Sequence, residues 1–398
     1  MPAGLRELGI DLHSAAFIAD PYPYYDRLRE VSPILYDPEW NLWFVSSYAD
    51  INALLRDRRL GRDMEGAPKP DPQTPFGKLH HNSLMEKEPP DHTRLRALVN
   101  KAFTPTRVEA LRPQVSAIAH HLIDLVQSRG EMDLLTDFAE PLPVMVIAEL
   151  LGVPSEGHPF LRPWSHAIVA MYELSPSVEQ ARKADQAVSE FSAYLQGLIA
   201  ERRRVPRADL ISALVAAEED GERLSEDELV ATCILMLNAG HEATVNAIAN
   251  GMLALMRHAD QYDLLRQSPE LLKTAVEEVL RYDTPLQLFR RWVREDLEYQ
   301  GLRFRRGDQL ALLYAAANRD PAHFPDPHRF DITRQENLHL GFGAGIHYCV
   351  GAPLARLEMQ VAFQVLSERL PKLRLAAEPL EYRPGFVIRG LKSLPIVF

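Results

Sequence analysis

The hydrophobic positions of the chain recur with the period of an α-helix over most of its length. Segments of ordinary helix length with this pattern are residues 20–30, 106–129, 138–151, 160–172 and 177–204. A longer helix is predicted to begin at a capping box formed by Ser225 and Glu228 and to continue without a proline to about His258. At about 1.5 Å per residue it would be roughly 50 Å long. Residues 229–237 are apolar almost all round, so we expect this helix to be buried.

Strand-like patterns are shorter than the helical ones. Two apolar runs flank Asp37-Pro38-Glu39-Trp40, which predicts a β-hairpin, and further strand-like segments surround Leu297, Leu310 and Val387. We therefore predict a mainly α fold with a smaller β-rich part. The β-rich segments are expected near residues 31–46, 290–312 and 372–398. Residues 60–90 follow neither period and are rich in proline, glycine and charge, which predicts a long loop.

Composition narrows the classes of function. No glycine/serine linker, charge block or repeat divides the 398-residue chain, so residues 1–398 are interpreted as one domain. A net charge of −11 argues against nucleic-acid binding and against an anionic membrane surface. No run of about 18 apolar residues occurs, which predicts no membrane span. With Cys233 and Cys349 as the only cysteines, no disulfide framework is possible, and we expect a soluble, cytoplasmic monomer.

The most informative segment is the glycine-rich run at residues 341–351. Glycines at every second position make a poor strand and a poor helix, but they let a backbone lie flat against a bulky group. Cys349 follows them, and Pro353 stands in the first turn of the next helix, where no N–H is needed. The positive end of that helix favours thiolate over thiol. A thiolate beneath a flat ligand is what axial ligation of haem iron needs. A small buried cysteine in a loop is the alternative interpretation.

Phe342 lies beside this cysteine in the chain, and His347 precedes it by two positions. With them, the segment resembles the haem-binding signature of the cytochrome P450 superfamily. The resemblance covers nearly the whole chain from about residue 20 and includes further motifs in the same order. It implies the cytochrome P450 fold, with a long central helix over a haem and a cysteine loop beneath it, as in the soluble bacterial type. It also implies haem b (iron protoporphyrin IX) as the cofactor, Cys349 as the iron ligand, and Phe342, Gly343 and His347 as cofactor contacts.

The middle of the long helix changes character at residues 238–244, which interrupt its apolar stretch. Ala239 and Gly240 would let a flat group approach or let the helix bulge, and a buried carboxylate at Glu242 is costly unless it is paired or functional. A helix kink with Glu242 reaching solvent is the alternative. In the resembled family the matching run passes over the haem and binds oxygen. Ala239, Gly240 and Glu242 match that run, and Ala239 is expected to contact the cofactor.

One position departs from the family pattern. Ala243 stands where the proton-relay threonine of the family is usual. Thr244 cannot simply replace it, because one helical step rotates a side chain by about 100°. We therefore expect the relay to use water, Glu242 or a hydroxyl on the substrate. Gly240, Glu242, Ala243 and Thr244 are the candidate catalytic residues.

Basic side chains in two segments match the propionate-binding residues of the family. His92 and Arg96 fall at i and i+4 on one face of a helix that Asp91 can cap, and an ordinary polar helix face is the alternative for this pair. Arg291 matches the second propionate arginine. The fork of an arginine suits a carboxylate geometrically.

A further charged motif is assigned a structural role. Glu278 and Arg281, at i and i+3, match the Glu-x-x-Arg motif of the family, although as an isolated surface pair they would carry no information. Arg329 matches the third member of this group. The resemblance implies that the three residues lock the core under the haem.

The resemblance also places segments around the substrate. The expected pocket residues are His241, Leu286, Gln287, Phe289, Val387 and Ile388. His80 and His81 are further candidate polar groups at the pocket edge. Met171 and Tyr172, where two helices meet, are interpreted as packing residues rather than substrate contacts.

The function implied is that of a haem-thiolate monooxygenase of secondary metabolism, which inserts one oxygen atom of O2 into an apolar small molecule by hydroxylation or epoxidation. Two cysteines cannot bind an iron–sulfur cluster and no flavin unit is recognised, so a separate partner would supply electrons. The resemblance implies that this partner is a ferredoxin with its ferredoxin reductase. Candidate charges for binding that partner are Arg94, Lys101, Arg107 and Arg356. The alternatives are a peroxide-driven oxygenase, favoured by Ala243, and a non-catalytic haem-binding or gas-sensing protein.

Overall fold

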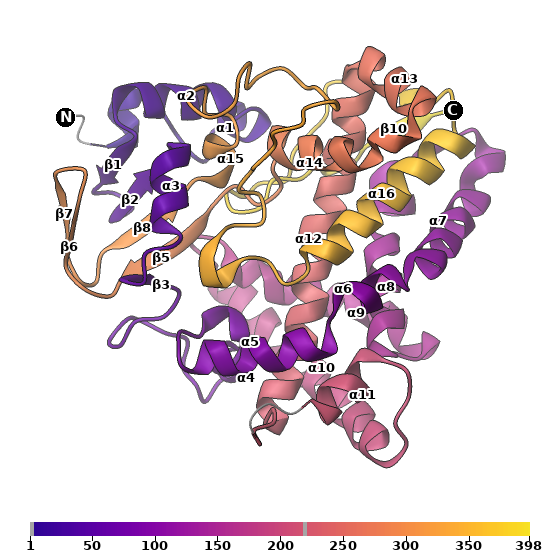
Figure 1. Ribbon diagram of the computed structural model, residues 1–398, viewed down its shortest axis with the longest axis horizontal. Helices are drawn as coiled ribbons and strands as arrows, with labels where there is room; N and C mark the ends of the chain where they lie inside the picture. Colours follow the sequence, from indigo (N-terminus) through magenta and orange to yellow (C-terminus); the bar gives the residue numbers. More distant parts are fainter. Residues whose placement is uncertain (1–3, 218–220) are drawn as a thin grey trace.

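Helices form most of the molecule, and a smaller sheet region lies to one side of them (Figure 1). The computed structural model describes residues 4–217 and 221–398. The α-helices are α1 (Ala15–Ala19), α2 (Tyr22–Val31), α3 (Tyr48–Leu54), α4 (Pro75–Asn82), α5 (Asp91–Ala102), α6 (Pro105–Glu109), α7 (Arg112–Val126), α8 (Pro141–Leu151), α9 (His158–Val169), α10 (Val178–Arg204), α11 (Leu210–Ala216), α12 (Glu226–Arg257), α13 (Ala259–Gln267), α14 (Leu272–Tyr282), α15 (Tyr314–Ala317) and α16 (Ala352–Arg369). The predicted mainly α fold is confirmed.

The strands pair into three sheets. They are β1 (Ile34–Asp37), β2 (Leu42–Val45), β3 (Leu60–Gly61), β4 (Glu131–Asp133), β5 (Phe289–Val293), β6 (Leu297–Tyr299), β7 (Leu302–Phe304), β8 (Gln309–Leu312), β9 (Arg374–Leu375) and β10 (Pro395–Val397). The largest sheet has the order β1-β2-β8-β5-β3, in which only the β2–β8 pair is parallel. Its β1–β2 unit is the predicted hairpin. The segment at Val387 is not a strand: its neighbour Ile388 makes only an isolated bridge to Leu286.

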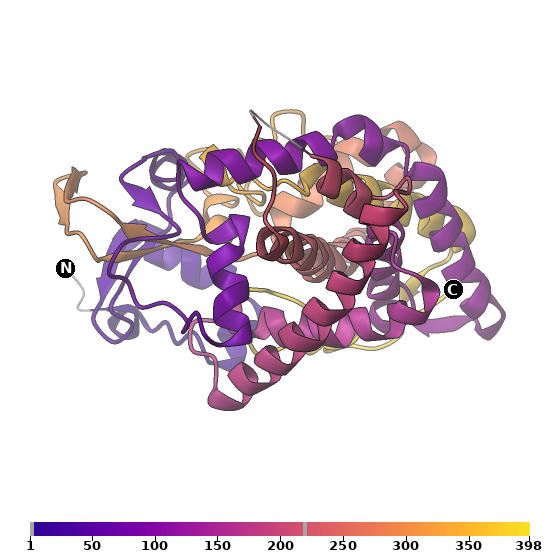
Figure 2. The same ribbon diagram turned by 90° about the horizontal axis from the view of Figure 1, so that it is seen from below.

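The helix α12 crosses the middle of the molecule, and Figure 2 shows it almost end-on with other helices around it. The predicted capping box is present, because the Ser225 hydroxyl accepts a bond from the Glu228 amide at 3.2 Å and the Glu228 carboxylate accepts one from the Ser225 amide at 2.8 Å. The helix remains continuous through residues 238–244. The predicted long helix is therefore confirmed, and the polar and small residues at 238–244 interrupt its apolar stretch without ending it.

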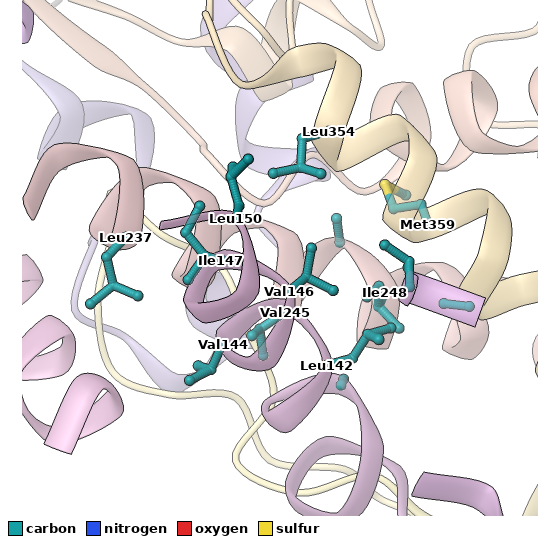
Figure 3. Close-up of a cluster of buried hydrophobic side chains, with 14 of the residues drawn as sticks. Leu142, Val144, Val146, Ile147, Leu150, Leu237, Val245, Ile248, Leu354 and Met359 are labelled. Atoms are coloured by element: carbon teal, nitrogen blue, oxygen red, sulfur yellow. The ribbon is translucent and has the colours of Figure 1, made fainter. Parts of the chain in front are cut away.

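Apolar side chains of α8, α12 and α16 form the core around this helix. Leu142 and Ile147 of α8 lie against Leu237 and Val245 of α12, and Leu354 of α16 closes the cluster (Figure 3). All of these side chains are buried. Removing this apolar surface from water is the main source of stability for the helical part. A second buried cluster joins the largest sheet to the N-terminal helices.

The expected loop at residues 60–90 contains a helix that the sequence pattern did not predict. α4 begins after Thr74, whose hydroxyl accepts a bond from the Gly77 amide at 3.1 Å, and Pro75 occupies its first turn. A threonine followed by a proline is a helix start signal, but the eight-residue helix is too short to show a clear period. His80 and His81 lie in its last turn.

A buried ion pair fixes α14 to the chain that follows β8. The Arg281 guanidinium donates to both oxygens of Glu278 at 2.7 and 2.8 Å, and both side chains are fully buried. The third charged residue is Arg334, whose Nε lies 3.3 Å from Glu278 Oε2. Arg329 was expected there, and that prediction is wrong. Its side chain is 65% exposed beside Asp331, and it is the Arg329 backbone carbonyl that accepts a bond from Arg281 at 3.0 Å.

Replacing Arg334 with alanine should lower the free energy of unfolding by roughly 1–3 kcal/mol, because Glu278 would lose one of its buried cationic partners. The matched variant Arg329→Ala removes an exposed arginine from the same segment and should cost less than about 0.5 kcal/mol. Urea unfolding followed by circular dichroism measures both. Equal losses, or a larger loss for Arg329→Ala, would show that Arg334 is not the third member of the group.

Candidate active site

A large cavity is lined both by the middle of α12 and by the loop that carries Cys349. It contains about 1760 Å³ of empty space, including its open mouth. The sequence-predicted residues that line it are His92, Arg96, Ala239, Gly240, Glu242, Ala243, Thr244, Leu286, Phe289, Arg291, Phe342, Gly343, His347, Cys349, Val387 and Ile388. The fold therefore brings segments that are distant in the chain to one site.

The loop before Cys349 is held by its own backbone and by α3. The Cys349 amide donates to the Phe342 carbonyl at 3.1 Å, which closes the loop. Gly343 and Gly345 have φ values of 68° and 69°, a region that disfavours other residues. A Cβ on Gly345 would lie 2.3 Å from the Leu55 carbonyl oxygen. Gly345 is thus required by contact with the chain after α3, whereas Gly343 lines the cavity.

The charge state of Cys349 depends on whether a cation contacts its sulfur. Burial raises the pKa of its thiol, although hydrogen bonds from the Gly351 and Ala352 amides and the charges of Arg96 and Arg356 act in the opposite direction. The amides at the helix end favour thiolate, as expected, but desolvation is the larger effect and leaves the pKa of the thiol raised. A thiolate here needs a further cation in contact with the sulfur, and a metal ion supplies one.

Arg291 provides an independent test of which ligand the cavity fits. Its guanidinium is buried, and burial lowers its pKa. Within residues 4–217 and 221–398 it has no ion pair with a carboxylate; its Nη1 donates to the Arg290 carbonyl at 3.0 Å, and the Tyr314 hydroxyl is its other polar neighbour. A buried cation without an anion is costly. A ligand with carboxylate groups would supply the anion, as the propionates of a haem do, so the donor set at both ends of this site fits a haem-thiolate cofactor.

Two histidines lie at the same end of the cavity. The rings of His92 and His347 are 4.5 Å apart, and His347 Nε2 lies 2.9 Å from an oxygen of Glu88. Burial and the charge of His347 lower the pKa of His92 to about 4. His92 is therefore neutral at pH 7 and can donate one hydrogen bond. Arg96, one turn later, donates to the Tyr348 carbonyl at 2.8 Å.

Glu242 connects the cavity to the molecular surface. Its Oε1 lies 3.3 Å from Nδ1 of His166, a residue of α9 whose side chain is 69% exposed. The guanidinium of Arg383 lies 3.9 Å from the other oxygen. Burial raises the pKa of Glu242, but the His166 hydrogen bond and the charges of His241, His166 and Arg383 together hold it below its ordinary value. The carboxylate is paired rather than solvent-exposed on a kinked helix.

Two predicted pocket residues do not line the cavity. Gln287 is buried elsewhere, because its amide accepts a bond from the Tyr25 hydroxyl at 2.8 Å and donates to the Thr284 carbonyl at 2.5 Å. His241 points away from the cavity wall, and its Nδ1 lies 3.4 Å from the Ser165 hydroxyl. Both assignments to the pocket are corrected. A polar residue next to a pocket segment gives no sign in the sequence of which way its side chain points.

Sequence reasoning also missed residues that do line the cavity. Arg62 reaches it from the chain after β3, while its guanidinium donates to Glu86 at 2.6 Å. Tyr172, interpreted as a packing residue, lines the cavity as well. Neither residue has a recognisable motif around it, so only the tertiary contacts identify them.

Several of the charges proposed for partner binding are already paired. Arg94 contacts Glu228 and lies 3.2 Å from Glu222. Arg356 is held by Glu277, with donor–acceptor distances of 2.6 and 2.8 Å. These side chains are less available to a partner than the sequence indicated.

Comparison with known proteins agrees with the geometry. The family model for cytochrome P450 matches residues 40–369. The chain belongs to the cytochrome P450 family. A biotin biosynthesis cytochrome P450 of Bacillus subtilis (strain 168) is 40% identical over 390 residues, covering 97% of this chain and 98% of the relative. The cytochrome P450 monooxygenase PikC of Streptomyces venezuelae is 44% identical over 389 residues, covering 96% and 91%.

Solved structures confirm the cytochrome P450 fold. The crystal structure of P450BioI in complex with hexadec-9Z-enoic acid ligated acyl carrier protein has a TM-score of 0.92 and 39% identity, covering 96% of this chain and 99% of that chain. The myxobacterial CYP267B1 in complex with myristic acid has a TM-score of 0.89 and 42% identity, covering 97% and 98%. This P450 is therefore an oxidoreductase of the monooxygenase class with a haem-thiolate cofactor. Within the described residues, no helix combines the length and the apolar character needed to span a membrane.

Replacing His166 with alanine should move the acid limb of the pH–activity profile to higher pH. The His166 hydrogen bond lowers the pKa of Glu242, and without it the effect of burial raises that pKa, so Glu242 would protonate at a higher pH. Product formation measured from pH 5 to pH 9 tests this. The exposed His121→Ala variant should match the wild type, and a His166→Ala profile identical to both would contradict the role of this hydrogen bond.

Proposed function

We propose that this P450 uses haem b to insert one oxygen atom of O2 into an apolar small molecule, by hydroxylation or epoxidation, with electrons from a separate ferredoxin and ferredoxin reductase. The observation that carries this proposal is the mainly apolar cavity that reaches from Cys349 to the middle of α12. Haem, when bound, supplies the iron at which dioxygen is reduced and from which one oxygen atom is transferred. We propose the cytoplasm as the location, because Cys233 and Cys349 are both free thiols.

The chain would bind the cofactor through residues that line the cavity. Cys349 would ligate the iron, and His92, Arg96 and Arg291 would hold the propionates. Ala239 and Gly240 keep the α12 wall of the cavity thin, because neither residue has a side chain longer than a methyl group. Their small side chains leave room over the ring for a diatomic molecule.

The substrate class follows from the wall and from relatives. Leu286, Phe289, Val387 and Ile388 present apolar surface to the cavity. Similar structures are complexes with an acyl carrier protein that carries hexadec-9Z-enoic acid, with myristic acid, and with corticosterone. These relatives, together with the polyketide and biotin biosynthesis P450s, support a lipid, polyketide or terpenoid substrate of secondary metabolism.

Reconstitution with a ferredoxin, its reductase and NADPH under ¹⁸O2 tests the proposal. Compounds that displace the iron-bound water are first selected by the change in haem absorption. Mass spectrometry of their products should show one labelled oxygen atom per turnover. A product without label, or no product from any compound that binds, would contradict a monooxygenase function.

Peroxide-driven oxygenation is the second candidate, because Ala243 brings no hydroxyl to the cavity wall.

We propose that a substrate hydroxyl or water replaces the missing Ala243 hydroxyl in proton delivery, beside Glu242 and Thr244. Ala243→Thr should then improve the coupling of O2 consumption to product for substrates that lack a hydroxyl. A gain of up to about tenfold is expected, smaller than the roughly 10²–10⁴-fold that a positioned proton donor contributes to a rate, because coupling cannot exceed one product per O2 consumed.

Hydroxylated substrates, which carry their own donor, should gain little from Ala243→Thr. Oxygen electrode and product measurements on the same samples give the coupling. Unchanged coupling with every substrate would sink substrate-assisted protonation. Faster turnover with hydrogen peroxide than with the electron chain would favour the peroxide-driven function.

A further inference from the structure

A row of polar residues runs along one face of the buried helix α12. Asn238, Glu242, Asn246 and Asn250 are spaced four residues apart, so their side chains stack on one side of the helix. All four are buried. A buried polar group needs a hydrogen-bond partner, and an exception calls for an explanation.

Protein contacts satisfy at least one polar atom in three of these four residues, although the Oδ1 atoms of Asn246 and Asn250 have no hydrogen-bond partner in the described part of the chain. Glu242 is paired with His166, Asn246 donates to the Glu242 carbonyl at 2.8 Å, and Asn250 donates to the Arg389 carbonyl at 3.3 Å. They hold α12 against its surroundings. Their amide and carboxylate groups therefore have a structural or a proton-holding role.

Asn238 differs from the other two asparagines of the row because it lines the cavity and because its amide nitrogen, unlike theirs, donates to no described residue. Its side chain lines the cavity and is only 5% exposed, and its Oδ1 has no hydrogen-bond partner in the described part of the chain. The amide nitrogen likewise has no hydrogen bond to a described residue. Its cavity-lining neighbours on the helix, Leu235, Met236 and Ala239, are apolar. An unpaired amide in such a wall costs about 1–3 kcal/mol unless a ligand satisfies it.

We infer that Asn238 is a specificity-determining residue that binds a hydroxyl group of the substrate, an inference that rests on the proposed function. An amide offers one acceptor and two donors, and the unpartnered oxygen requires a donor. A hydroxyl can donate to the oxygen or accept from the nitrogen, whichever way the amide is turned. The expected substrate is therefore an apolar molecule that already carries a hydroxyl group. A cavity that pairs a polar group in this way rejects the analogue without it.

The position of Asn238 separates recognition from chemistry. It lies one turn before Glu242, about 6 Å away along the helix axis. A hydroxyl bound there would hold one end of the substrate beside Asn238, and Ala239 and Ala243 line the same cavity further along the helix. Asn238 is therefore a binding residue and takes no part in proton delivery.

Cyclododecanol and cyclododecane form a probe pair that differs by one hydroxyl. Their dissociation constants for the haem-loaded wild type and for Asn238→Leu are measured from the change in haem absorption. In Asn238→Leu the dissociation constant of the alcohol, divided by that of the alkane, should be about five- to tenfold larger than in the wild type. This factor is the value of one neutral hydrogen bond. Met236, two residues before Asn238, also lines the cavity and is apolar. The control variant Met236→Leu should change the ratio by less than about twofold.

Thermal unfolding separates this role from a structural one. Asn238→Leu removes an unpaired buried amide, so its melting temperature should equal or exceed that of the wild type. A lower melting temperature with an unchanged selectivity ratio would show that Asn238 is structural and would overturn the inference. The inference would also be overturned if the wild type and Asn238→Leu showed the same ratio of alcohol to alkane dissociation constants. Because these are binding measurements, failure of the proposed oxygenation would be seen separately, as an absence of labelled product.

Discussion

A sulfur anion cannot be buried without a positive partner, and this constraint organises the structure around Cys349. Desolvation raises the pKa of the thiol despite two backbone N–H groups and two nearby arginines. A metal ion in contact with the sulfur reverses that balance. One ligand explains three further features: the loop geometry, the buried Arg291 at the cavity edge and the thin wall of α12. All three fit a flat, anionic, iron-containing ligand in the space between them.

The second requirement is a rigid frame, which the apolar core and the Glu278–Arg281 pair supply. α12 is buried along most of its length against α8 and α16, so its polar residues are held at fixed positions. The pair on α14 is fully buried and also bonds to backbone carbonyls of the segment that leads to the cysteine loop. Buried pairs of this kind hold a conformation more reliably than they add net stability. The frame therefore holds the sulfur of Cys349 and the cavity-lining face of α12 at fixed positions relative to each other.

Much of this arrangement could be predicted from the sequence. The capping box at Ser225 predicted α12 because it depends on local sequence, whereas the fold and the role of the cysteine loop were implied by the resemblance of several motifs to one family. The errors lie where side-chain direction decides. Arg329 and Arg334 are five residues apart in an irregular segment, and only tertiary structure shows which guanidinium reaches Glu278. Gln287 and His241 face protein groups rather than the cavity, whereas Tyr172 lines the cavity although no motif surrounds it. The helix α4 was missed because it is short.

The carbon monoxide difference spectrum of the reduced protein tests the assignment of Cys349 most directly. It should be recorded for the wild type and for Cys349→Ala, each produced in haem-replete cells. The wild type should show the absorption band typical of thiolate-ligated haem, and Cys349→Ala should lack it, with the His121→Ala variant behaving as the wild type. A colourless wild type, or a thiolate-type band that persists in Cys349→Ala, would contradict iron ligation by this sulfur.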